Sequence, residues 1–343
     1  MKRAAQAPLN CGAVPAFISP AFIAAFLTAA TATAKVFAVG AIGFYATYRR
    51  WISEEGWSGM SALVAFVTLP CLIFTRFATQ FDARTFPGWW KIALVGMALQ
   101  IAGLALGYWI AKRHRNPETT MLLGFQNAGF FVLPMLQALL SPREFGRAAV
   151  MLFVFVIFFN SSLWIVGQRV LLGKRALSWK RILLSPPLFA TLISLGFFGL
   201  FHDFGHGFET SVPWQIFLGG DSPGALPLVG DLTVPLATLI LGGAVAGTIG
   251  AKSGAQDKWF AWEIAAWKLF FMPLCGYGLL RLFHVEDPTL RLLWMLECAA
   301  PPAINVAVFC QQHGYPMRLI PVTCLLTYGL CIATVPFWVA LVL

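Results

Sequence analysis

The sequence predicts an all-α integral membrane protein with ten transmembrane helices, arranged as two inverted repeats of five. Its residues are 59% hydrophobic and 11% charged, whereas soluble domains carry about 25% charged residues. Uncharged runs of at least 20 residues recur along the chain, each long enough to cross a hydrocarbon core of about 30 Å. These runs are 56–75, 92–111, 119–142, 148–168, 182–201, 232–251 and 319–343.

Three further spans contain one charge each: Lys35, Lys268 and Glu297 lie in the first, eighth and ninth helices. We expect Lys268 to lie close enough to a helix end for its ammonium to reach the interface. The ten expected helices cover 22–47, 58–79, 90–111, 118–140, 146–171, 182–201, 228–250, 262–281, 290–312 and 319–342.

Two short motifs recur at an offset of five helices. VTLP at 67–70 in the second helix is matched by LTVP at 232–235 in the seventh, and NAGFF at 127–131 by NVAVF at 305–309. Because five is odd, the second set of helices begins on the opposite membrane face. The halves, 1–172 and 173–343, are therefore expected to be inverted repeats, a design used by secondary transporters.

The distribution of basic residues predicts the orientation. The formal net charge is +10, but the basic residues flank apolar runs, which favours lipid head groups over nucleic acid as their partner. The densest clusters, at 112–115 and 169–181, fall on one face. We expect that face to be cytoplasmic, with both termini outside, in a plasma membrane or cell inner membrane. Polar residues near the amino terminus argue against a cleaved signal peptide.

Amides and prolines interrupt the fourth and ninth helices. A proline removes one backbone hydrogen bond, and irregular backbone persists in a membrane only inside protein or beside a water-filled cavity. A broken helix offers free N–H groups that suit an anion, and an amide adds donors without burying a charge. The alternative is that the amides merely cap a kink. The expected substrate-binding residues are Asn127, Asn305 and Gln126, and the expected helix-breaking residues are Pro134, Pro301 and Pro302.

Lys35 and Glu297 are candidate coupling groups or charge partners, since ionisable residues within a membrane span are commonly functional. Lys35 could instead lie near an interface, and Glu297 could form a static ion pair with Lys268. His202 and His206 have the spacing of a metal pair, but glycines interrupt the segment and favour a solvated loop. We expect no metal and no cofactor, and the absence of catalytic motifs argues against an enzyme.

Three segments, GFQNAGFFVLP, PLATLILGGA and APPAINVAVFCQQHGYPMRLIPVTCLLTYGLCIATVPFW, resemble the auxin efflux carrier (PIN-like) family, in particular bacterial permeases with a short central loop. The resemblance implies crossed, broken fourth and ninth helices in a transport domain that moves against helices one, two, six and seven. It places the crossover residues at Asn127, Pro134, Pro302 and Asn305, and Gln126 stands where the family usually has glycine. It also implies small organic acids, such as malate, malonate or an auxin-like acid, as substrates.

We therefore expect a secondary transporter of a small organic anion that works by alternating access. The alternatives are a sodium-coupled symporter of the bile-acid carrier type and a channel. The oligomeric state is open, with a homodimer as one candidate.

Overall fold

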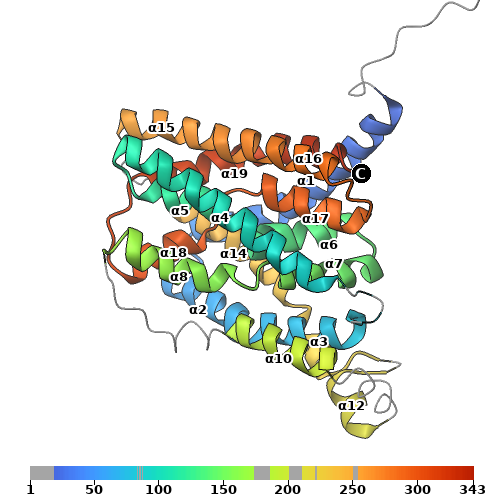
Figure 1. Ribbon diagram of the computed structural model, residues 1–343. Helices are drawn as coiled ribbons and strands as arrows, with labels where there is room; N and C mark the ends of the chain where they lie inside the picture. Colours follow the sequence, from blue (N-terminus) through green and yellow to red (C-terminus); the bar gives the residue numbers. More distant parts are fainter. Residues whose placement is uncertain are drawn as a thin grey trace, which may run out of the picture.

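The computed structural model describes residues 19–343 except 83, 85, 87, 174–185, 201–210, 221 and 250–253. All regular elements in these ranges are helices (Figure 1). The segment with His202 and His206 lies outside the described residues. In chain order the elements are α1 (Pro20–Tyr48), α2 (Glu54–Leu63), η2 (Val64–Thr68), α3 (Leu69–Gln80), α4 (Trp89–His114), α5 (Glu118–Gly124), η3 (Ala128–Val132), α6 (Leu133–Leu139), α7 (Pro142–Phe155), α8 (Phe159–Val170), α10 (Pro186–Leu200), α12 (Val212–Phe217), α13 (Ala225–Gly230), α14 (Thr233–Gly247), α15 (Ala255–Ala266), η4 (Trp267–Phe271), α16 (Met272–Leu282), α17 (Pro288–Ala299), α18 (Asn305–Gln312) and α19 (Leu319–Ala340).

Among the described residues, five helices are long and apolar enough to cross a membrane, which confirms the prediction of an all-helical, multi-pass membrane protein. They are Pro20–Tyr48, Glu54–Gln80, Trp89–His114, Ala225–Gly247 and Leu319–Ala340. The other expected spans are shorter, more charged or interrupted. The interruptions lie at 125–127, 156–158 and 300–304.

Three turns of π-helix, η2, η3 and η4, each end just before an X-Pro pair. Pro70, Pro134 and Pro273 follow these turns at the second position of the next α-helix. Because proline has no N–H, carbonyls of the preceding turn accept hydrogen bonds from residues five positions later instead of four. Ala128 O, for example, accepts from Leu133 N. The prolines thus widen continuous helices without breaking them.

Glycines bring α1 and α14 into close contact. A Cβ atom added to Gly242 would overlap the backbone of Gly40, and one added to Gly43 would overlap the carbonyl of Leu239. Small residues of this kind let membrane helices approach closely and gain dispersion energy. α3 packs in turn against α10 and α13 at the lower edge of Figure 1, and α14 also contacts α2.

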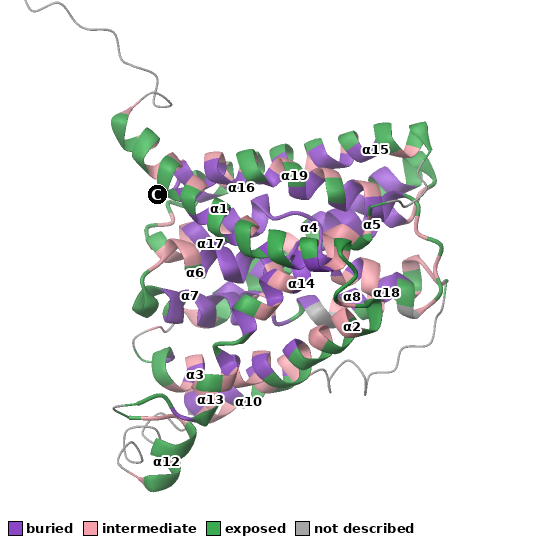
Figure 2. Cartoon of the chain, turned by 180° about the vertical axis from the view of Figure 1, so that it is seen from behind, coloured by how far each residue is buried: buried purple, intermediate pink, exposed green. Residues whose placement is uncertain are grey.

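A second group of helices surrounds the interrupted segments. α4 packs against α5 and α7, while α17 packs against α16 and α19. Figure 2 shows α5, α7 and α17 largely buried, whereas α12 and the outer side of α15 are exposed. The interruptions at 125–127 and 300–304 therefore lie deep in the protein rather than at its lipid-facing surface.

Candidate functional site

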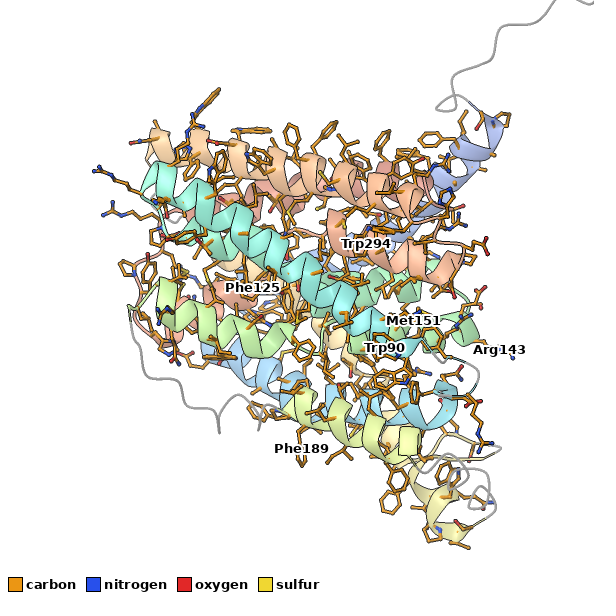
Figure 3. The ribbon with its side chains drawn as sticks, in the orientation of Figure 1. Trp90, Phe125, Arg143, Met151, Phe189 and Trp294 are labelled. Atoms are coloured by element: carbon orange, nitrogen blue, oxygen red, sulfur yellow. The ribbon has the colours of Figure 1, made fainter. Side chains whose placement is uncertain are left out.

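The two deep interruptions meet and bond to each other. The backbone N–H of Asn127 donates to the carbonyl of Pro301 (2.9 Å), and that of Ala303 donates to the carbonyl of Phe125 (2.9 Å). Gln126 and Pro302 form an antiparallel bridge between them. Each segment thus supplies the backbone partners that the other lost when its helix ended, as a water-poor interior requires. Phe125, labelled in Figure 3, marks this crossing near the centre of the molecule.

Both ends of the Asn127 side chain are engaged by the protein. Its Oδ1 accepts from the N–H of Phe130 (3.1 Å) and caps η3, while its Nδ2 donates to the hydroxyl of Tyr328 (2.5 Å). The Tyr328 hydroxyl donates to the carbonyl of Pro302 (2.9 Å). Tyr328 on α19 therefore holds both interruptions together. Sequence reasoning missed it, because a tyrosine inside an apolar helix gives no local signal of its partner.

Asn305 lies in a different environment. It is the first residue of α18, it is half-buried, and its side-chain amide has no hydrogen-bond partner among the described residues. The backbone N–H groups of Ile304, Asn305 and Gly129 also have no carbonyl partner in the described chain. Helix amino ends carry partial positive charge. These unpaired donors, next to the crossing, can bind a negatively charged oxygen.

A cavity of about 1290 Å³ opens from the crossing toward one end of the bundle. Gln126, Asn127, Gly129 and Asn305 line its inner end, and exposed Glu54 lies at its mouth. Its walls are largely apolar and aromatic, and the described lining contains no Lys or Arg. The aromatic lining residues are Trp57, Phe66, Phe130, Phe153, Phe159, Trp164 and Phe309.

Two of the three expected helix-breaking prolines lie at an interruption, and the third does not. Pro301 and Pro302 lie within the interruption at 300–304, and both of their carbonyls accept hydrogen bonds there. Pro134 does not lie at a break, so this prediction was wrong. The fourth helix is interrupted at 125–127 instead, and Pro134 follows η3 inside the helical run Ala128–Leu139. The break lies earlier because Asn127 caps the new helix before the proline is reached.

The charged residues of the expected membrane spans lie in different environments. Lys35 is exposed on α1 and does not line the cavity. Lys268 is 0% exposed, which overturns the expectation that its ammonium reaches the interface. The reason is that the face of η4 with Lys268 packs against α17 and α19, whereas Phe270 and Phe271 on the same turn are exposed.

Lys268 and Glu297 lie together behind the crossing. The Lys268 Nζ donates to the carbonyl of Leu123 (3.1 Å), and the buried Glu297 side chain lies in the same region without forming an ion pair with it in the described chain. Gln126 lies beside that carboxylate, but the contact falls short of a hydrogen bond. Neither Lys268 nor Glu297 lines the cavity. No cluster of three metal-binding side chains occurs within the described ranges.

Comparison with known proteins shows which family has this sequence pattern. The model of the family described as membrane transport protein matches residues 28–177 and 171–339, which together cover most of the chain. The chain belongs to the membrane transport protein family. This match and the relatives below confirm the resemblance to auxin efflux carriers. The short central loop of bacterial permeases stays a prediction.

Two curated relatives come from Arabidopsis thaliana. The protein PIN-LIKES 5 is 28% identical over 168 residues, which is 46% of this chain and 39% of that protein. The protein PIN-LIKES 7 is 29% identical over 119 residues, or 33% of this chain and 30% of that protein. The matched region of this membrane transport protein thus spans less than half the length of either relative.

Proposed function

We propose that the chain is a secondary carrier that moves a small carboxylate-bearing organic anion by alternating access around the crossing. The observation that carries the proposal is the free amide of Asn305 beside unpaired N–H groups at the inner end of a large cavity. A carboxylate bound there would satisfy donors that have no partner among the described residues. Membership of a transport family supports transport, rather than catalysis, as the use of this site.

The proposed architecture is ten helices in two inverted five-helix repeats, 1–172 and 173–343. The interrupted elements α5–α6 and α17–α18 would be the crossed fourth and ninth helices. In this reading the close α1–α14 pair, with α2, α3 and α10, forms a scaffold. The helices around the crossing form the part that moves. Transporter sites built from broken helices at a repeat interface follow the same principle.

The cavity indicates which face is open. Its lining includes Thr47, Gln168 and Thr248, at the ends of α1, α8 and α14. These ends precede connections that carry basic residues, which the distribution of charge places in the cytoplasm. We therefore infer a cytoplasm-facing state of a carrier in a plasma membrane or cell inner membrane, with both termini outside. A homodimer stays a prediction.

The lining also bears on the substrate. The donors at the crossing suit one carboxylate, whereas the apolar, aromatic walls suit a carbon skeleton. Because the described lining contains no Lys or Arg, a second carboxylate would find no permanent positive charge there, and His313 is the one described lining residue that can be protonated near neutral pH. Among small organic acids, an auxin-like monocarboxylate therefore fits this cavity better than malate or malonate.

Uptake by purified carrier in liposomes tests the proposal. Asn305→Ala should abolish uptake of a monocarboxylate while the protein keeps its thermal midpoint, because the Asn305 side chain makes no hydrogen bond to any described residue. Gln256→Ala, which removes an amide from the exposed surface of α15, is the matched control and should transport normally. Full uptake by Asn305→Ala would refute this binding site. Counterflow of labelled substrate distinguishes a carrier from a channel, which does not exchange substrate.

A further inference from the structure

The region behind the crossing collects negative charge from helix ends. α5 and α17 both end there, at Gly124 and Ala299, and the carboxyl end of a helix carries partial negative charge. Glu297, in the last turn of α17, adds a carboxylate that is 1% exposed. Burying negative charge without a compensating cation is costly, so a positive group at this place would be stabilising.

Lys268 supplies that positive group from a helix outside both interrupted segments. Its Nζ donates to Leu123 O, one of the last carbonyls of α5. The next carbonyl, Gly124 O, accepts from the Gln100 side chain on α4. Lys268 belongs to η4, and π turns of this kind often occur at functional sites. The last two carbonyls of α5 thus accept hydrogen bonds from one ammonium and one side-chain amide.

We propose that Lys268 is a built-in cation of the crossing, whose ammonium fills a place that a diffusible sodium or potassium ion could otherwise occupy. Leu123 O and the Glu297 carboxylate are oxygen groups of the kind that such cations bind. The tethered ammonium neutralises them at every stage of transport. This inference rests on the proposed carrier function only where it concerns transport, and it predicts that neither substrate binding nor movement requires sodium or potassium.

The first experiment measures the thermal midpoint of the purified, full-length protein in detergent, in sodium, potassium or choline chloride at equal ionic strength. The wild type should unfold at the same midpoint in all three salts. A cation that bound the folded state would raise it. A rise specific to sodium or potassium would overturn the proposal, and this measurement needs no variant.

The second experiment removes the ammonium. Lys268→Ala should lower the midpoint by several degrees, and methylammonium chloride should restore much of the loss by filling the space left by the side chain. Lys258→Ala, ten residues earlier on the same continuous helix but exposed, should show neither effect. A Lys268→Ala protein with an unchanged midpoint would overturn the proposal, as would one with no response to methylammonium.

Should Lys268→Ala fail to fold, the double variant Lys268→Met with Glu297→Gln keeps the test open. It removes both charges together and should unfold at a higher midpoint than Lys268→Met alone. Equal midpoints would contradict charge compensation between the two residues.

A transport measurement separates this inference from the proposed function. Uptake into liposomes should proceed equally in sodium and choline. Sodium-dependent uptake would overturn the role of Lys268 and leave the carrier intact. If no organic acid were transported while the midpoints behaved as expected, the proposed function would fail and the built-in cation would stand.

Discussion

The Asn127 amide and the Tyr328 hydroxyl are joined by a hydrogen bond of 2.5 Å that links the interrupted fourth helix to the last helix of the chain. The same hydroxyl donates to Pro302 O in the other interruption. One tyrosine therefore connects two segments that are 175 positions apart in sequence, Asn127 and Pro302.

Replacing Tyr328 by Phe should destabilise the protein by about 1–3 kcal/mol, because the carbonyl of Pro302 and one donor of Asn127 would be left buried without a partner. We expect uptake to fall as well, since the spacing of the two interruptions is no longer fixed. The thermal midpoint and the uptake rate measure the two effects. Tyr108→Phe on the exposed side of α4 is the control and should change neither. A Tyr328→Phe protein with wild-type stability would show that the hydroxyl does not hold the crossing.

Glu118 should be a stabilising cap for α19. Its carboxylate accepts hydrogen bonds from the N–H groups of Arg318 (3.1 Å), Leu319 (2.9 Å) and Ile320 (2.8 Å), at the positive end of that helix. Glu118→Ala should cost about 1–2 kcal/mol of stability. Glu144→Ala, which removes the exposed carboxylate that accepts from the N–H and hydroxyl of Ser141 in the capping box of α7, should cost less. The two midpoints compare the caps directly, and an equal loss would contradict a special role for Glu118.

Gly242 should tolerate no side chain. A methyl group at this position would overlap the backbone of Gly40, and a backbone contact cannot move aside as a flexible side chain can. Gly242→Ala should therefore separate α1 from α14 and destabilise the protein by about 1–3 kcal/mol, the usual cost of overpacking. Gly247→Ala, on the same helix with open space beside it, is the matched control. Unchanged stability of Gly242→Ala would mean that the two helices do not need their close contact.

Gly129, unlike Gly242, should tolerate a side chain without loss of stability. It is exposed to the cavity, and a Cβ added there meets nothing within 4 Å. Gly129→Leu should leave the thermal midpoint near that of the wild type and reduce uptake strongly, because the side chain would project into the space proposed for the substrate. Gly278→Leu, an equally open glycine on α16 away from the cavity, should transport normally. Normal uptake by Gly129→Leu would place the substrate elsewhere.

Glu297 allows a test of proton coupling. The residue lies next to Lys268 and away from the cavity, which favours a static counter-charge over a coupling group. Glu297→Gln should therefore lower stability but keep the shape of the pH profile of uptake. A profile that became flat in Glu297→Gln, with the wild type pH-dependent, would instead establish Glu297 as the coupling carboxylate.

The sequence alone was sufficient to predict the fold class. Long apolar runs have one stable solution in a membrane, which is the helix, so their presence follows from composition. The amide motifs also lie at both interrupted segments: Asn127 ends the interruption at 125–127, and Pro301 and Pro302 lie in the one at 300–304, directly before Asn305, whereas Pro134 lies away from the break.

Tertiary structure alone decided what each polar residue does. Pro134 follows a π turn because Asn127 begins the helix earlier, and Asn127 is occupied by Tyr328, a residue two hundred positions away. Lys268 is buried rather than interfacial because other helices cover it, and Lys35 is exposed because none of the described helices covers it. Local sequence fixes hydrophobicity and backbone propensity. Which donors remain free for a substrate depends on partners that only the folded chain brings together.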